Sequence, residues 1–166
     1  ASEKAVTLAI NDLNDPAVIT GTSAASLNET DVVQSTGGAL AATDEDGPPT
    51  FIVQTNVAGS NGFGKFSIGS DGIWTYTMDT AHDEFIVGVR YMDSVSVTTD
   101  DGTPQMVTVT IIGTNDAPVI SSLAADARGA VKEAGHLDDG TVVAGTVTAT
   151  GTLAATDVDA GATKTW

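Results

Sequence analysis

The 166-residue sequence contains no cysteine, so neither a disulfide scaffold nor a thiolate metal site is available to it. A protein outside the cell that lacks disulfides needs another means of stabilisation, and bound cations are one candidate. Long hydrophobic runs are also missing, since no stretch approaches the roughly 20 apolar residues of a membrane-spanning helix. The start of the sequence shows no basic region followed by an apolar one, as a secretory signal would. We therefore expect no membrane insertion by these residues.

Positive charge is scarce. Six Lys and Arg face 22 Asp and Glu, which gives a net charge of -16 and a pI near 4.1. The phosphate backbone would repel such a surface, so the composition excludes an ordinary nucleic-acid-binding protein. An anionic membrane surface is disfavoured for the same reason. Most of the acidic residues are Asp beside Gly, Asn or Thr, which is typical of turns because the short Asp side chain bonds its own backbone.

Helical periodicity of useful length is absent, and we expect at most one short turn at residues 79–85. Hydrophobic residues make up 41% of the chain, which is enough for a buried core. Short alternating or β-branched segments recur, and Asp71-Gly72 and Asp101-Gly102 are hairpin signals. About seven strands in about 100 residues predict an all-β, immunoglobulin-like Greek-key β-sandwich. The expected strands are 50–57, 64–68, 72–78, 84–92, 94–99 and 106–112.

Two pairs of segments match each other in the same order. Residues 6–19 match residues 107–120 at a shift of 101, and "GALAATDED" from Gly38 matches "GTLAATDVD" from Gly151 at a shift of 113. Such matches predict a repeat with a period of about 100 residues. We expect 1–13 to be the last strand of a preceding repeat, 14–116 a complete sandwich, and 117–166 the truncated start of the next. That start lacks sheet partners, so we expect it to be poorly ordered beyond about residue 121. The expected partners are neighbouring repeats of the same chain.

Four segments carry a family resemblance: "GALAATDEDG", "GKFSIGSDGIWTYTMD", "DSVSVTTDDGT" and "VTVTIIGTNDAPVI". In this order they resemble the VCBS repeats, cadherin-like modules of giant bacterial surface proteins and RTX-type secreted proteins, over nearly all of residues 14–120. The resemblance implies an immunoglobulin-like sandwich in long arrays, extracellular or on a bacterial cell surface, associated with adhesion. The first joint reads Pro16-Ala17 where the second reads Ala117-Pro118. Proline in either order restricts the backbone at the joint.

The joints also carry the candidate metal ligands. Ca²⁺ takes 6 to 8 oxygen ligands from carboxylates, Asn and carbonyl groups. A D-x-N-D linker followed about 30 residues later by D-x-D resembles the calcium ligands between cadherin modules. That resemblance makes Asp12, Asn14, Asp15, Asp44 and Asp46 the candidates at the first joint, with Glu29 as a further one. At the second joint the candidates are Asn115, Asp116, Asp157 and Asp159, where Gly113 replaces the leading Asp.

An ordinary structural interpretation of the same residues stays open. Asn-Asp before Pro is a common turn, and the carboxylates of Asp-x-Asp-Gly can cap backbone amides. A hairpin turn explains Asp71 and the segment Asp100-Asp101-Gly102 better than metal binding does. The sequence therefore leaves two interpretations of the joints: acidic turns alone, or acidic turns that bind Ca²⁺.

Other motifs are weak. His82 and His136 lie in acidic segments without a partner at zinc-ligand spacing, and we expect both to be solvent-exposed. The segment "GSNGFGK" at 59–65 lacks the P-loop pattern and is interpreted as a turn. Trp74 and Tyr76 share one face of a strand, and we assign them to the core rather than to a sugar-stacking surface. The sequence shows no nucleophile–base pair or acid–base constellation, so we expect no enzyme.

Together these observations predict a non-catalytic extender and adhesion module of a repetitive bacterial surface or secreted protein, with joints that Ca²⁺ rigidifies. The first alternative is a carbohydrate- or protein-binding module that uses exposed Trp74, Tyr76 or the 59–65 loop. The second is an accessory domain of a secreted hydrolase. Any glycan or protein ligand would belong to the full-length protein.

Overall fold

The computed structural model describes residues 3–4 and 13–159. The chain divides into two compact units, Ala1–Thr114 and Asn115–Trp166, which are described separately below as the first and the second unit. Within the described ranges, no helix is long and apolar enough to cross a membrane.

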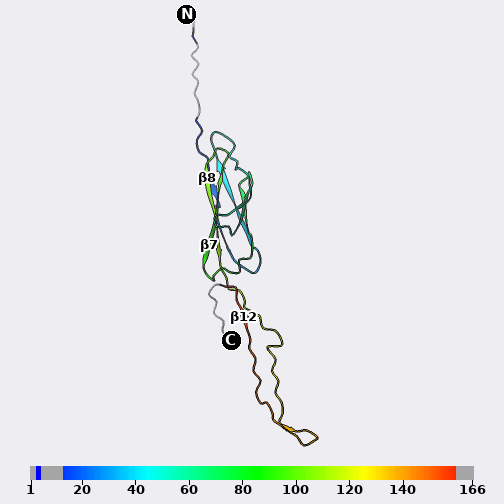
Figure 1. Ribbon diagram of the computed structural model, residues 1–166. Coiled ribbons are helices and arrows are strands. Elements are labelled where there is room, and N and C mark those ends of the chain that lie inside the picture. Colours follow the sequence, from blue (N-terminus) through cyan, green and yellow to red (C-terminus); the bar gives the residue numbers. More distant parts are fainter. Residues whose placement is uncertain (1–2, 5–12, 160–166) are drawn as a thin grey trace. The chain divides into compact units, whose positions relative to one another are not determined.

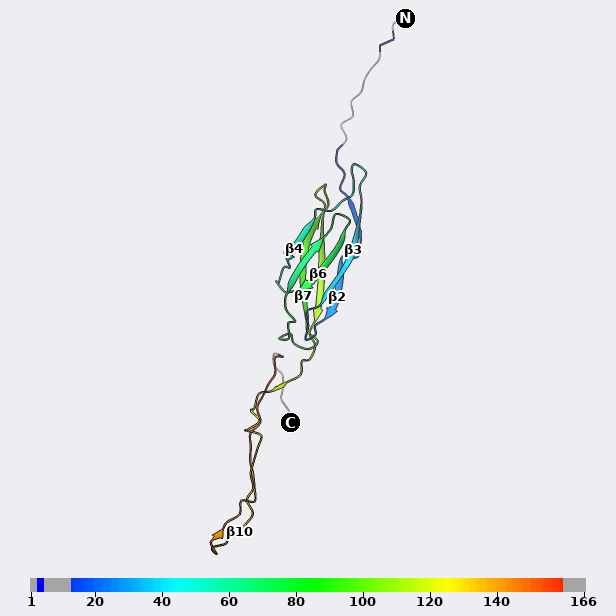
Figure 2. The same ribbon diagram turned by 90° about the vertical axis from the view of Figure 1, so that its right-hand side faces the viewer.

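The first unit is a sandwich of two sheets (Figures 1 and 2). A five-stranded antiparallel sheet has the order β1-β3-β6-β5-β4, and a three-stranded sheet has the order β2-β8-β7. In the smaller sheet β2 runs parallel to β8, and β7 runs antiparallel to it. This arrangement confirms the all-β, immunoglobulin-like prediction. The strands are β1 (Val18–Gly21), β2 (Ala24–Asn28), β3 (Ser35–Thr43), β4 (Gln54–Ala58), β5 (Gly64–Ile68), β6 (Ile73–Met78), β7 (Arg90–Thr98) and β8 (Pro104–Ile112).

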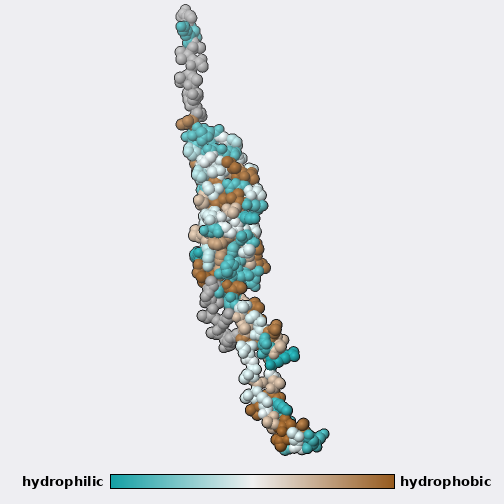
Figure 3. All heavy atoms as spheres, viewed as in Figure 1, coloured by the Kyte–Doolittle hydropathy of each residue, from teal (hydrophilic) through white to brown (hydrophobic). Residues whose placement is uncertain are grey.

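Alternation along the strands builds the core between the sheets. On β6, Trp74 and Tyr76 are 1% and 0% exposed, and on β8 Val107 and Val109 are both fully buried. The indole Nε1 of Trp74 donates a hydrogen bond to the Thr22 carbonyl at 2.7 Å. The predicted core role of Trp74 and Tyr76 is confirmed, so the alternative that they form an exposed binding platform is wrong. On the face drawn in Figure 3, hydrophobic residues are interspersed with hydrophilic ones over the first unit.

Three of the expected strands have clearly different bounds, and in the first of them, 50–57, the strand β4 begins only at Gln54. Residues 84–89 form turns, and β7 begins only at Arg90 and continues through the segment predicted as a separate strand. The physical reason is that Phe85 is buried from a turn, where its ring stacks on Tyr91 with centroids 3.7 Å apart. Phe85 and the partly buried Tyr91 therefore contribute to the core without a continuous ladder, whereas Ile86, Val87, Val89 and Met92 are exposed. The expected short turn at 79–85 is present, closed by the Phe85 amide donating to the His82 carbonyl at 2.9 Å.

The second unit carries short strand pairs. β9 (Val119–Ile120) pairs with β12 (Ala155–Thr156), and β10 (Gly135–His136) pairs with β11 (Val142–Val143). Thr156 lies opposite Val119 just as Thr43 lies opposite Val18 in the first unit. These pairs differ by the shifts of 113 and 101 that the repeat predicts. The longer connection in the second copy contains the β10–β11 hairpin. The repeat bounds 1–13, 14–116 and 117–166 and the poor order beyond residue 121 stay predictions.

A buried carboxylate connects the two sheets of the first unit. Asp93 on β7 is 0% exposed and accepts the backbone amides of Asn61 at 2.8 Å and Phe63 at 3.1 Å. It also accepts the Tyr76 hydroxyl at 3.2 Å. Burial, and then the Asp93 charge, raise the pKa of Tyr76, so its hydroxyl keeps the proton that it donates. The 59–65 loop is the expected turn, and its amides bind Asp93 inside the protein.

Gly59 makes this arrangement possible. A Cβ atom added there would lie 2.1 Å from the Asp93 carboxylate, which its bonds hold in place. We expect Gly59→Ala to lower the free energy of unfolding by about 1–3 kcal/mol, the usual effect of overfilling a core. Gly47→Ala is the matched control, because nothing lies within 4 Å of a Cβ there. Denaturant unfolding of the two variants measures the difference, and equal stabilities would contradict the proposed role of Gly59.

Candidate metal-binding site

The first unit holds a buried glutamate directly after β2. The parallel register places Asn28 opposite Ile112, and the Glu29 amide donates to the Ile112 carbonyl at 2.9 Å. The Glu29 Oε2 atom accepts the Thr114 amide at 2.8 Å, and the Thr114 hydroxyl donates to the Glu29 carbonyl at 3.0 Å. Glu29 is 0% exposed. The end of β2 therefore holds its carboxylate against the segment that leaves β8.

A second carboxylate lies beside it. Asp83 comes from the loop between β6 and β7, and one of its oxygens lies within 4.8 Å of a Glu29 oxygen. Glu29 Oε1 and Asp83 Oδ1 are both buried without a hydrogen-bond partner. Two such groups repel each other, and each buried polar atom without a partner destabilises the fold by about 1–3 kcal/mol. A hard divalent cation would satisfy both oxygens at once, so the residues present fit Ca²⁺.

The structure corrects the sequence-based grouping of Glu29. Glu29 was expected with the acids of the first joint, but it lies near Ile112, at the end of β8. Those acids lie near the start of β8, where Asp101 in the preceding turn accepts the Ala17 amide at 2.8 Å. A strand rises about 3.3 Å per residue, so the nine residues of β8 separate its ends by roughly 25–30 Å. Glu29 cannot share a cation with the first joint.

The first-joint acids do meet each other. The Asp15 amide donates to Asp46 Oδ2, and Asp44 Oδ1 accepts the amides of Asp46 at 2.7 Å and Gly47 at 3.2 Å. The Asn14 side-chain amide donates to the Asp15 carbonyl at 3.1 Å. Asp12 lies outside the described residues. These are the backbone-capping bonds of the turn interpretation. The carboxylates of Asp15, Asp44 and Asp46 do not come within 4.8 Å of one another as a group of three. An open hollow beside them is lined by Asp15, Pro16, Val18, Thr43, Asp44 and Glu45.

The second unit repeats this connection. The Asp116 amide donates to Asp159 Oδ2 at 2.9 Å, and the Asp159 amide donates to Asp157 Oδ1 at 3.1 Å. The Asn115 side-chain amide donates to the Asp116 carbonyl at 2.7 Å. Each bond has its equivalent in the first unit. We call this arrangement the aspartate clasp: Asn14, Asp15, Asp44 and Asp46 in one copy, Asn115, Asp116, Asp157 and Asp159 in the other.

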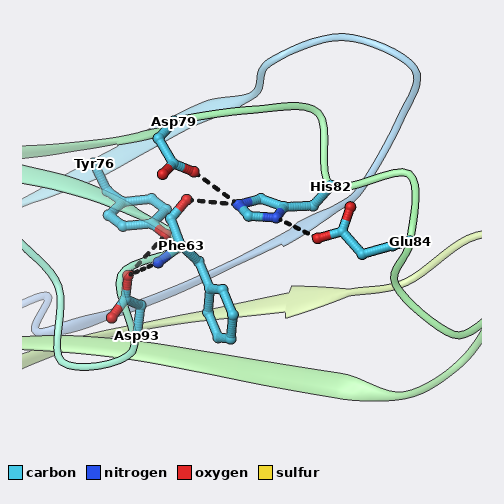
Figure 4. A network of polar contacts seen from close by, with 6 residues as sticks. All are labelled: Phe63, Tyr76, Asp79, His82, Glu84 and Asp93. Carbon is cyan, nitrogen blue, oxygen red and sulfur yellow. Dashed lines mark hydrogen bonds and ion pairs between the residues drawn. The ribbon is translucent and has the colours of Figure 1, made fainter.

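His82 precedes Asp83 and lies inside the protein, whereas His136 is exposed as expected. Figure 4 shows the His82 ring between acceptors: Nδ1 is 2.9 Å from Glu84 Oε1, and Nε2 is 2.9 Å from both Asp79 Oδ1 and the Phe63 carbonyl. Burial acts to lower the pKa of His82, but hydrogen bonds with Glu84, the Phe63 carbonyl and Asp79 outweigh burial and raise it. The predicted exposure of His82 is wrong, because the ring fills an aromatic slot.

Sequence reasoning also missed Asp83. Its neighbours "TAHDEF" look like an ordinary acidic loop, and Glu29 precedes it by 54 positions. Glu29 and Asp83 are not part of a common sequence motif. Asp83 is distinguished by its proximity to Glu29 and by a buried oxygen without a partner, which arise only when the loop packs against the end of β2.

Among models of known protein families, the bacterial cadherin-like domain matches residues 14–113. The chain belongs to the bacterial cadherin-like domain family. No curated protein matches the chain at a significant level. Membership supports an extracellular, immunoglobulin-like module of a kind that is generally non-catalytic and often binds Ca²⁺. The narrower assignment to VCBS repeats stays a prediction.

In this cadherin-like domain the Asp101 turn secures the N-terminal segment. Besides the Ala17 amide, Asp101 accepts the hydroxyls of Thr99 and Thr103, the latter at 2.7 Å, and the Thr103 amide at 3.0 Å. The bonds from Thr99, Thr103 and Ala17 hold the pKa of Asp101 well below its usual range. The predicted hairpin turn is confirmed, and the carboxylate has a structural role.

A depressed pKa stabilises the fold above the usual pKa of Asp, and this contribution is lost as pH falls through the folded-state value. Asp101→Asn removes it, so the variant should be less stable than wild type at neutral pH. The difference should shrink steadily below about pH 4, near the ordinary pKa of Asp. Denaturant unfolding between pH 3 and 7 measures it. Asp31→Asn, at an exposed position, is the control, and a pH-independent difference for Asp101→Asn would contradict the prediction.

Proposed function

We propose that this domain is a non-catalytic extender and adhesion module of a repetitive bacterial surface or secreted protein, whose joints bind Ca²⁺. The observation that carries the proposal is the Glu29–Asp83 pair: Glu29 is buried and Asp83 half-buried, and each has a buried carboxylate oxygen that has no hydrogen-bond partner. Such a pair is unfavourable unless a cation joins it. Family membership, the acidic composition and the lack of disulfides support the same conclusion.

Chain connectivity supports a joint site. Thr114 is hydrogen-bonded to Glu29, and Asn115 and Asp116 follow it directly. Two residues of extended chain span at most about 7 Å, so the pair lies close to the point where the joint begins. The equivalent residues Asn14 and Asp15 stand at the start of the domain. A tandem array would then repeat the site at every joint.

A cation at the joint would act on both stability and shape. It would cancel the repulsion between carboxylates and tie the loop of Asp83 and the end of β2 to the segment that leaves the domain. Because Ca²⁺ would bind the folded state alone, its binding energy would add to stability, by about 2.7 kcal/mol at a free concentration 100 times the Kd. Bending between neighbouring repeats would be restricted. A ligand-binding domain elsewhere in the protein could then be held away from the cell surface.

Thermal unfolding tests the calcium site. The melting temperature of the chain should rise by several degrees from chelator to millimolar Ca²⁺ and should rise less with Mg²⁺, which demands a stricter octahedral geometry. Asp83→Asn should abolish the calcium-specific rise. Without metal, the same variant should be as stable as wild type or more stable, because it removes one of two repelling carboxylates.

Asp31→Asn is the matched control, since it removes one negative charge at an exposed site and should keep the full response to calcium. Glu29→Gln provides a second test of the same pair. A wild-type melting temperature that is equal in chelator and in Ca²⁺ would exclude the calcium site and leave a metal-free spacer.

A further inference from the structure

We propose that His82 is a positioning residue that holds Asp83 in place for the cation. The inference rests on the proposed calcium site and adds a residue that binds no metal itself. Figure 4 shows the ring at the centre of the 79–85 loop, with acceptors on both sides. Asp83 follows His82 directly, and Glu84, which contacts the ring, follows Asp83. Both neighbours of Asp83 are therefore joined through one imidazole.

The loop has little backbone bonding of its own. The Asp79 amide donates to the Phe63 carbonyl at 3.1 Å, and the Phe85 amide donates to the His82 carbonyl at 2.9 Å. Between these two backbone bonds, the hydrogen bonds of the His82 side chain hold the two sides of the loop together. Its Nε2 reaches Asp79 and the Phe63 carbonyl before β5, while Nδ1 reaches Glu84 on the opposite side. An imidazole is suited to this task because its two nitrogens form hydrogen bonds in opposite directions from one rigid ring.

Aromatic contacts fix the plane of the ring. His82 stacks on Phe85 with centroids 4.6 Å apart and an interplanar angle of 8°, and it meets Phe63 edge to face at 5.5 Å. Phe85 stacks in turn on Tyr91 of β7. The His82 ring is thus tied to a residue next to β5 in one sheet and, through Phe85, to β7 in the other. Loop movements that would displace Asp83 have to break these contacts.

The backbone at His82 is strained. Its φ is 62°, in the left-handed region that non-glycine residues rarely adopt. Such a conformation is unfavourable and persists only where surrounding contacts enforce it. Here the enforcing contacts are those of the His82 ring itself. The turn that results directs the next residue, Asp83, to within 4.8 Å of Glu29.

The loop would not hold this shape by charge alone. Asp79, Asp83 and Glu84 lie within six residues and are all acidic, so they repel one another in the absence of a donor between them. His82 places both of its ring nitrogens among them, 2.9 Å from Glu84 on one side and from Asp79 on the other. Residues that orient metal ligands typically change metal affinity 10- to 100-fold when they are replaced. We expect an effect of about that size for His82.

Chemical rescue provides the test. His82→Gly relieves the strained φ and leaves an imidazole-shaped slot, so calcium affinity, measured by titration calorimetry on the whole chain, should fall roughly 10- to 100-fold. Added imidazole should restore most of the affinity, because both of its nitrogens can form hydrogen bonds, one on each side of the slot. The matched probe is 1-methylimidazole, which cannot donate from both nitrogens and should not restore it. Imidazole is a poor ligand for Ca²⁺, so wild type should be unaffected.

The possible results separate the two proposals. If wild type binds no calcium, the proposed function itself fails. If wild type binds and His82→Gly binds equally well, or if both compounds restore affinity equally, His82 is not a positioning residue. His136→Gly, at an exposed histidine, should leave affinity unchanged. Should His82→Gly fail to fold, His82→Asn tolerates positive φ and donates to one side only, so wild-type affinity in that variant would equally overturn the inference.

Discussion

The parallel pairing of β2 with β8 determines where the polar groups of this domain lie. The N-terminal segment first joins the five-stranded sheet as β1 and then crosses to the other sheet as β2. Because β2 runs in the same direction as β8, the end of β2 and the end of β8 lie together. Glu29 is therefore beside Thr114, where the chain leaves the domain, while Asp15, Asp44 and Asp46 gather at the opposite end. One strand crossing thus gives the domain an acidic group at each end.

Asp93 and Glu29 are both fully buried, but their hydrogen bonding differs. Asp93 has amides and a hydroxyl directed at both oxygens, and it joins the 59–65 loop to β6 and β7. Glu29 is buried to the same degree, but only Oε2 is bonded, and its neighbour Asp83 has the same deficit. A satisfied carboxylate stabilises the fold outright, whereas an unsatisfied pair needs a ligand. The candidate site is distinguished by carboxylate oxygens that lack hydrogen-bond partners, and not by the acidic composition.

The internal repeat is visible in the hydrogen bonds of the two units as well as in the amino-acid sequence. The aspartate clasp recurs with the same donors and acceptors in both units, and the β9–β12 register reproduces that of β1 and β3. The aspartate clasp gives the repeated sequence segments a structural role at the joints. The proposed calcium site rests on the Glu29–Asp83 pair and does not need the clasp residues to leave their turns.

The sequence by itself determined the features that depend on near neighbours. The alternation in β5, β6 and β8, the Asp-Gly turns at 71–72 and 101–102, the burial of Trp74 and Tyr76, and the family follow from local patterns. Tertiary structure alone decided three others. It paired Glu29 with Asp83, buried His82 in an aromatic slot, and turned residues 84–89 away from a strand. Each of these depends on residues brought together from distant positions, such as the 54 that separate Glu29 from Asp83, and no local periodicity or turn preference encodes such a meeting.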